Sequence, residues 1–251
     1  MVDIHSHVLP GLDDGSKSIE ESVKMLEMAA EAGTTDIVAT PHANTEYAFN
    51  PAAIESLLAE LRGRLGNRIR LHSGCDFHLM FENIQDALNN PTKYTIDHKQ
   101  WLLVEFSDFI IFPNTAELLG RLREGGMLPI ITHPERNQIL QRRFNDLQRW
   151  VLEGSYIQVT ALSLLGTFGG EARKFSEQLI EAGLVHFIAS DAHDTEYRTT
   201  RLDTAFEWLS KKYGEEYAFS VCMDNPSATI EGRPFLNSVM PAKRKKFLGV
   251  F

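Results

Sequence analysis

Short apolar segments alternate along the chain with longer segments in which apolar residues recur every three or four positions. The short segments predict buried β-strands, and the longer ones predict amphipathic helices. The expected strands lie roughly 30 residues apart, which is the length of a strand–helix unit. They are Val2–Ile4, Ile37–Ala39, Ile69–His72, Trp101–Glu105, Leu128–Thr132, Tyr156–Val159 and Val185–Ala189.

Helix signals lie between most of these strands. Ser18 and Glu21 have the spacing of a capping box and begin a pattern that ends at Gly33. Asn50 and Pro51 are a favourable N-cap and first helical residue. Further helical patterns cover Asn114–Arg123, Phe144–Leu152, Ala172–Ala182 and Leu202–Lys212.

This alternation predicts an α/β fold whose parallel sheet is closed, or nearly closed, into a barrel. An open doubly wound sheet is the alternative, because periodicity does not show closure. No stretch rich in Gly, Ser or Pro resembles a linker, so we expect a single domain over residues 1–251. A basic tail begins at about residue 241 and includes Lys243–Lys246, a run typical of a solvated tail.

Composition narrows the classes of function. The 251 residues are 43% hydrophobic and 24% charged, as in an ordinary globular protein. The formal charge of −9 argues against a nucleic-acid partner, whose phosphates attract basic surfaces. Two cysteines provide neither a disulfide framework nor a Cys-rich zinc cluster. The sequence shows no signal peptide and no apolar run that reaches the length of a membrane span, so we expect a cytoplasmic location.

Histidines and acidic residues gather where the predicted strands end. The carboxyl ends of parallel strands open on one face, so these side chains are expected to converge. The members of each dyad, His5-x-His7 and Asp191-x-His193, face the same side because side chains of an extended segment alternate. Imidazole and carboxylate without thiolate suit Mn²⁺, Fe²⁺ or Zn²⁺. The candidate ligands are His5, His7, His42, Asp76, Glu105, His133, Asp191 and His193.

Other polar residues are candidates either for the metal site or for a purely structural role. Glu105 ends an apolar strand, where a carboxylate is costly unless it is paired or bound to metal. Asp13 and Asp14 precede Gly15 in a turn-like loop; both are candidate ligands, and the alternative for one of them is a purely structural role in the turn or as a cap. The remaining histidines are expected to be ordinary core or surface groups: His72, His78, His98 and His186.

Two arginines lie shortly after candidate ligands. Arg136 follows His133 and Arg198 follows His193. The planar guanidinium fork matches phosphate oxygens, so arginines beside a metal cluster favour an anionic substrate. A surface ion pair is the alternative for each.

These motifs resemble those of the PHP (polymerase and histidinol phosphatase) superfamily. More narrowly, the chain resembles the manganese-dependent bacterial protein-tyrosine phosphatases that are encoded with capsule and exopolysaccharide genes. The resemblance extends from residue 1 to about residue 230 and is carried by His5–His7, Leu9–Gly15, Thr132–Arg136 and Ser190–His193.

The resemblance implies a distorted (β/α)₇ barrel that holds three ions, with Mn²⁺ favoured and Fe²⁺, Zn²⁺ or Mg²⁺ as alternatives. The first ion would take His5, His7 and Asp191. Asp76 would bridge to the second ion, which adds Glu105 and His133. The third would take His42, His193 and one of Asp13 or Asp14, with Asp14 favoured. Arg136 and Arg198 match the positions that hold phosphate. The family usually has glutamate where this chain has Asp76, which is shorter by one methylene and alters the geometry of the bridge.

The resemblance also implies an activity and a partner. The activity is hydrolysis of phosphotyrosine on proteins, and the partner is the tail of an autophosphorylated bacterial tyrosine kinase that controls capsule and exopolysaccharide synthesis. The oligomeric state is not indicated. A cysteine mechanism is excluded, because the Cys-x₅-Arg spacing would require arginine where Phe81 and Ala228 stand.

Three alternative functions stay open. One is a PHP phosphoesterase for a small phosphomonoester such as histidinol phosphate. A metal-dependent amidohydrolase is another, although the Asp191-x-His193 pair and the arginines disfavour it. The last is a binding module without catalysis.

Overall fold

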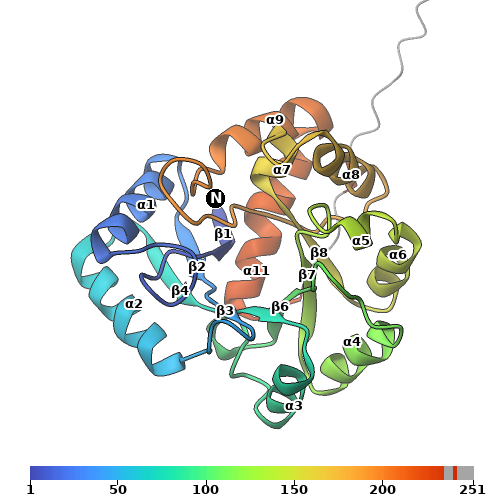
Figure 1. Cartoon of the computed structure of the whole chain (residues 1–251). Helices are drawn as coiled ribbons and strands as arrows, with labels where there is room; N and C mark the ends of the chain where they lie inside the picture. Colours follow the sequence, from blue (N-terminus) through green and yellow to red (C-terminus); the bar gives the residue numbers. More distant parts are fainter. Residues whose placement is uncertain (235–239, 242–251) are drawn as a thin grey trace, which may run out of the picture.

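Parallel strands lie in the interior of the molecule, and most of the helices surround them (Figure 1). The computed structural model describes residues 1–234, 240 and 241. The predicted basic segment Lys243–Lys246 therefore lies outside the described residues. Within the described part of the chain, no helix combines the length and the apolar character that crossing a membrane requires.

The strands form two sheets in which every pair is parallel. The first sheet has the order β1 (Val2–Ser6), β2 (Asp36–Ala39) and β4 (Arg70–Ser73). The second has the order β3 (His42–Ala43), β5 (Asp76–His78), β6 (Trp101–Glu105), β7 (Leu128–Thr132), β8 (Tyr156–Thr160) and β9 (Phe187–Ala189). The prediction of an α/β fold with parallel strands is confirmed.

Two segments that were predicted as single strands continue into a second strand, so the described residues contain nine strands rather than seven. The chain leaves β2 at Thr40 and Pro41 and enters β3; proline has no N–H group with which to continue the ladder. It leaves β4 at Gly74, where an added Cβ would lie 2.8 Å from the side chain of Val38. The breaks bring His42 and Asp76 into register as strand partners.

The first strand also contacts the chain that follows the last one. Ser6 forms an isolated parallel bridge with Ala192. The backbone N–H of Asp191 donates to the His5 carbonyl, and the N–H of His7 donates to the Ala192 carbonyl, each at 2.8 Å. The two predicted dyads are therefore held side by side by backbone hydrogen bonds.

Most of the helices lie around the strands, whereas α11 (Asn225–Glu231) is seen near the centre of the view, between strands of the two sheets (Figure 1). In chain order they are α1 (Ile19–Glu31), α2 (Pro51–Leu65), α3 (Phe81–Asn89), the 3₁₀ turn η1 (Ile96–His98), α4 (Thr115–Glu124), α5 (Gln138–Gln141), α6 (Phe144–Leu152), α7 (Ala161–Leu165), α8 (Gly170–Glu181), α9 (Asp203–Tyr213), α10 (Glu215–Phe219), the π-helical turn η2 (Ser220–Asp224) and α11 (Asn225–Glu231).

The predicted caps of the first two helices are present. The Ser18 hydroxyl accepts from the Glu21 N–H, and the Asn50 side chain accepts from the Ala53 N–H, each at 3.2 Å. The second half of the capping box differs from the expectation, because the Glu21 carboxylate accepts from the N–H of Lys17 rather than that of Ser18.

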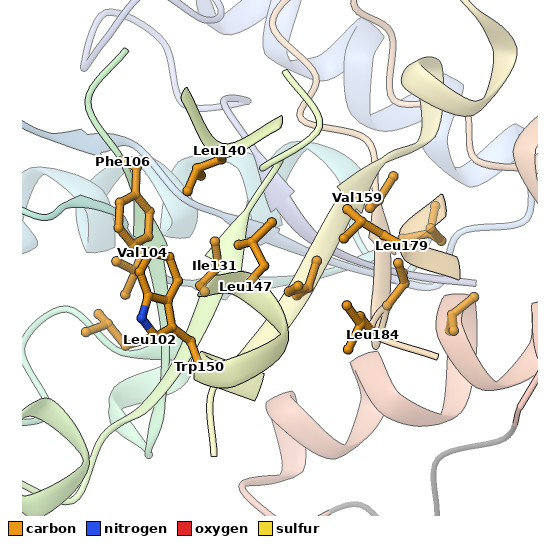
Figure 2. Packing of buried hydrophobic residues seen from close by; sticks show 14 of the residues in the cluster. Leu102, Val104, Phe106, Ile131, Leu140, Leu147, Trp150, Val159, Leu179 and Leu184 are labelled. Carbon is orange, nitrogen blue, oxygen red and sulfur yellow. The ribbon is translucent and has the colours of Figure 1, made fainter. Parts of the chain in front are cut away.

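Side chains on the two faces of the central strands enter different cores. Leu102 and Val104 of β6 belong to the cluster that packs beneath the helices, together with Trp150 of α6 (Figure 2). Trp101 and Leu103 belong to a second cluster that joins strands of both sheets. Because side chains alternate along a strand, Glu105 continues the face of Leu103 and lies at its carboxyl end.

Candidate metal centre

The side chains that were predicted from the strand ends converge. Atoms that can bind a metal ion form four overlapping groups, and within each group they all lie within 4.8 Å of one another. Nine of the ten predicted ligands belong to these groups, and the tenth, Asp13, does not. The groups are His7, Asp14, His42 and His193; His5, His7 and Asp76; His5, His133 and Asp191; and His42, Asp76 and Glu105.

Each imidazole ring of the His5-x-His7 dyad has one side-chain partner that orients it. The Nε2 atoms of His5 and His7 lie 3.2 Å apart. Nδ1 of His5 pairs with Oε1 of Gln158 at 3.0 Å, and Nδ1 of His7 pairs with Oδ2 of Asp13 at 2.7 Å. Such outer partners fix the ring and leave the other nitrogen free for a metal. Asp13 is therefore placed to orient His7.

Asp14, the next residue along the chain, faces two imidazoles. Its Oδ1 is 3.4 Å from Nε2 of His42 and 3.4 Å from Nε2 of His193. These hydrogen bonds from His193 and His42 hold the pKa of Asp14 well below its usual range. Of the two aspartates left open by the sequence, Asp14 is the one grouped with the other ligand atoms.

Asp76 lies at the centre of the ligand set and is fully buried. Its Oδ2 is 3.4 Å from Nε2 of His5 and 3.3 Å from Nδ1 of His42, but neither carboxylate oxygen has a hydrogen-bond partner. Burial raises the pKa of Asp76, yet the facing imidazoles outweigh burial and hold this pKa well below its usual range. A buried carboxylate without hydrogen bonds is costly, so these donors fit a divalent cation.

Glu105 and His133 lie near each other but belong to different ligand groups. Glu105 Oε2 lies 3.4 Å from Nδ1 of His42, and its Oε1 lies 3.7 Å from Nε2 of His133. The groups join Glu105 to His42 and Asp76, and join His133 to His5 and Asp191. Burial and the charge of Arg136 lower the pKa of His133 to about 4, so its ring is neutral, as a metal ligand requires.

Backbone strain is concentrated at two of these residues. His133 has φ 32° and Asp191 has φ 51°, in the left-handed region that non-glycine residues rarely adopt. His133 directly follows the end of β7, and Asp191 lies two residues beyond the end of β9. Such conformations persist where the surrounding structure compensates for them, and they cluster at functional sites.

Both predicted phosphate-binding arginines contact Asp191. Its Oδ2 accepts from Arg136 and, at 2.7 Å, from Arg198. Its Oδ1 faces His5 at 3.5 Å and His7 at 3.4 Å. The Nε atom of Arg198 is buried and has no hydrogen-bond partner. The two guanidinium groups therefore border the ligand cluster, and one of them retains an unused donor.

Three of the four remaining histidines have the ordinary roles that were expected. His72 lies between Asp36 and Asp97, His186 accepts from a backbone N–H, and His98 pairs with a backbone carbonyl. His78 is different: its Nδ1 lies 3.4 Å from Oε2 of Glu105. It borders the candidate centre, a role that its sequence position did not indicate.

Gln158 and Glu135 support the site but were not predicted. Gln158 lies in β8 between Ile157 and Val159, and an amide inside a buried strand was the available signal. Oε1 of Glu135 accepts from the N–H of Thr160 at 3.0 Å and from the Ser163 hydroxyl at 2.7 Å. Burial raises the pKa of Glu135 to about 7. Glu135 thereby ties the loop of His133 and Arg136 to the end of β8.

The cysteines are unsuited to nucleophilic catalysis. Cys75 and Cys222 are both fully buried. Burial raises the pKa of the Cys75 thiol well above its usual value and that of the Cys222 thiol to about 12. The thiolate is the reactive form, so neither residue can serve as a nucleophile near neutral pH.

Comparison with known proteins identifies similar chains of known family. The family model for capsular polysaccharide synthesis, CpsB/CapC, matches residues 1–231. The tyrosine-protein phosphatase YwqE of Bacillus subtilis is 35% identical over 257 residues, which cover 100% of both chains. The putative tyrosine-protein phosphatase CapC of Staphylococcus aureus is 37% identical over 223 residues and 86% of both chains.

A solved structure is also similar over nearly the whole chain. It is one of the crystal structures of YwqE from Bacillus subtilis and CpsB from Streptococcus pneumoniae, which are described as unique metal-dependent tyrosine phosphatases. The match has a TM-score of 0.88 and 30% identity, and it covers 97% of this chain and 100% of the other. The chain belongs to the CpsB/CapC family of capsular polysaccharide synthesis proteins.

Proposed function

We propose that this protein is a metal-dependent phosphatase that hydrolyses phosphotyrosine on other proteins. The observation that carries the proposal is the set of four overlapping ligand groups beside two arginines that share Asp191. The relatives named as tyrosine-protein phosphatases support the substrate class.

The ligand atoms are sufficient for more than one ion. We assign three sites: His5, His7 and Asp191; Glu105 and His133, with Asp76 between these two sites; and Asp14, His42 and His193. Mn²⁺ is the proposed ion, and Fe²⁺, Zn²⁺ and Mg²⁺ are its competitors. Divalent ions in such a centre polarise phosphoryl oxygens and lower the pKa of coordinated water towards 7.

The arginines supply the remaining positive charge. Arg136 and Arg198 already converge on one carboxylate oxygen, and the phosphoryl oxygens of a substrate would engage the same donors. This contact stabilises the negative charge that spreads over the phosphoryl oxygens in the transition state. Tyrosine has a pKa of about 10, so its phenolate leaves without a dedicated general acid.

The proposal extends to the partner and the domain. The substrate is the phosphorylated tail of a bacterial tyrosine kinase that controls capsule and exopolysaccharide synthesis. The chain acts as a single domain over residues 1–251, in which the two sheets form a distorted seven-unit barrel. The hydrogen bonds between β1 and the segment after β9 support this arrangement.

A metal-reconstitution experiment tests the function. The purified chain is stripped with EDTA, reloaded with each of the four ions, and assayed on a phosphotyrosine peptide and on histidinol phosphate. We expect Mn²⁺ to restore turnover of the peptide in preference to histidinol phosphate. The reverse preference would identify a small-molecule phosphoesterase, and the absence of turnover with every ion would identify a binding module.

Variants link the activity to the site. His193→Ala and Glu105→Ala should abolish turnover while circular dichroism shows a folded protein. His98→Ala removes an exposed histidine outside the ligand groups and is the matched control. Wild-type rates in His193→Ala and Glu105→Ala would defeat the assignment.

A further inference from the structure

One aromatic ring borders both arginines. The guanidinium carbon of Arg136 lies 4.4 Å from the ring centroid of Phe168, and that of Arg198 lies 5.9 Å from it. Cations are attracted to the electron-rich face of an aromatic ring at such distances. Phe168 is half-buried, so part of its ring is open to a ligand.

The chain carries Phe168 to this place through a short connection. Helix α7 follows β8 directly, and the loop from Gly166 to Gly169 then leads into α8. Both glycines have left-handed φ values, 89° and 91°, which favour glycine. The hydrogen bond from Ser163 of α7 to Glu135 links this connection to the loop of Arg136. The ring and the guanidinium are thus held by coupled segments.

A hollow lies beside the ring. It has a volume of about 600 Å³ and is lined by Phe168, Arg136, Gln138, Gln141, Arg142, Glu171 and Ala172. Sites for small molecules commonly enclose roughly 300–1,000 Å³, so this hollow has room for a substrate side chain next to Arg136. A phosphoryl group on the arginines would leave the group that it esterifies near Phe168.

We propose that Phe168 makes this site selective for aryl phosphates, because its ring stacks against the phenyl ring of the substrate while Arg136 and Arg198 bind the phosphoryl group. The inference rests on the proposed phosphotyrosine phosphatase activity and assigns its preference for tyrosine to one residue. Offset or edge-to-face aromatic pairs add affinity of between roughly twofold and tenfold beyond the area that they bury.

A purely structural role for the ring makes a different prediction. If Phe168 only held the arginines in place, its loss would weaken every phosphate ligand equally, since the phosphoryl group is common to all of them. Selectivity between ligands that differ only in aromaticity therefore separates the two roles.

The experiment measures binding rather than turnover. Phenylphosphonate and cyclohexylphosphonate, which differ in aromaticity but hardly in size, are titrated calorimetrically into the full chain with and without Mn²⁺. The proteins are the wild type, Phe168→Leu, Phe168→Tyr and the control Phe219→Leu, which alters a partly exposed phenylalanine at the end of α10. Turnover of a phosphotyrosine peptide is measured on the same samples.

We expect the wild type to prefer phenylphosphonate by between roughly twofold and tenfold. Phe168→Leu should remove the preference, and Phe168→Tyr and Phe219→Leu should keep it. Equal affinity of the wild type for both ligands, or an equal loss for both ligands in Phe168→Leu, would overturn the proposal. A phenyl preference that depends on Phe168 in a protein without peptide turnover would instead reject the proposed function and leave this inference standing.

Discussion

Asp76 is the carboxylate at the centre of the ligand set. Its carboxylate is buried without a hydrogen-bond partner, and imidazoles approach it from two strands. The pairing of His42 with Asp76 across β3 and β5 places the aspartate directly beside its neighbours. The register of these two strands thus holds Asp76 beside His42.

Removing the charge of Asp76 should disable the centre. We expect Asp76→Asn to lower kcat on phosphotyrosine peptide by at least about 100-fold and to reduce the amount of bound Mn²⁺. The reasons are that an amide is a weaker metal ligand than a carboxylate and that His5 and His42 lose the negative charge that faces them. Metal analysis and kinetics measure the effect, and the exposed Asp224→Asn serves as the control. An unchanged Mn²⁺ content would contradict the bridging role.

Gln158 should matter through the ring that it orients. Gln158→Leu removes the hydrogen bond to Nδ1 of His5, so we expect affinity for Mn²⁺ to fall by roughly 10- to 100-fold. Competition with a metal-sensitive dye measures this affinity. The matched variant Gln148→Leu alters an exposed glutamine of α6 and should bind Mn²⁺ like the wild type. Equal affinity in both variants would show that His5 needs no such partner.

At the scale of elements, the sequence predicts the strands that carry ligands but not the way in which they are joined. Alternation and strand ends locate Glu105 and His133 correctly, because these features are local. The breaks before β3 and β5 depend on close contact between segments, as at Gly74, which packs against Val38. Gln158 and Phe168 acquire their roles only from neighbours distant in the sequence.

The loop after β7 should depend on Glu135. Glu135→Ala leaves the N–H of Thr160 and the hydroxyl of Ser163 buried without their acceptor, and we expect the free energy of unfolding to fall by about 1–3 kcal/mol. Urea denaturation measures this change. Glu181→Ala, at an exposed position of α8, should change it by less than about 0.5 kcal/mol. Equal stabilities would show that Glu135 does not anchor the loop.

His72 joins β2, β4 and η1 through two carboxylates, and its contribution should depend on pH. Burial lowers the pKa of His72, but Asp36 and Asp97 outweigh burial and raise it. The ion pairs of protonated His72 therefore stabilise the folded chain fully below about pH 6.5, which is the usual pKa of histidine. This stabilisation is lost as the pH rises through the raised pKa of His72.

A variant makes this dependence measurable. We expect His72→Gln to be less stable than the wild type by about 1–2 kcal/mol at pH 6, because it loses hydrogen bonds between charged partners. The difference should shrink as pH rises towards 10. Urea denaturation across this range gives the values, and a difference that stays constant or grows with pH would be inconsistent with a protonated His72.

At the scale of the whole molecule, the candidate centre draws on both sheets. His5 belongs to the first sheet, while Asp76 and Glu105 belong to the second. A ligand that binds only the folded chain stabilises it, by about 2.7 kcal/mol per site at 100 times the dissociation constant. Metal binding is therefore expected to stabilise the fold as well as to support catalysis.

Thermal unfolding should report this linkage. We expect Mn²⁺ to raise the Tm of the EDTA-treated chain by several degrees, on the order of the shift that a few kcal/mol produces in a domain of this size. His193→Ala should show a smaller rise because it removes one ligand. An identical Tm with and without Mn²⁺ would show that the ligand groups do not bind the ion in the folded chain.

The buried thiols have a consequence for chemical resistance. Oxidation and alkylation of cysteine proceed through an accessible thiolate, and Cys75 and Cys222 offer neither access nor a low pKa. Hydrogen peroxide and iodoacetamide, which attack an exposed thiolate, find no such target on this phosphatase.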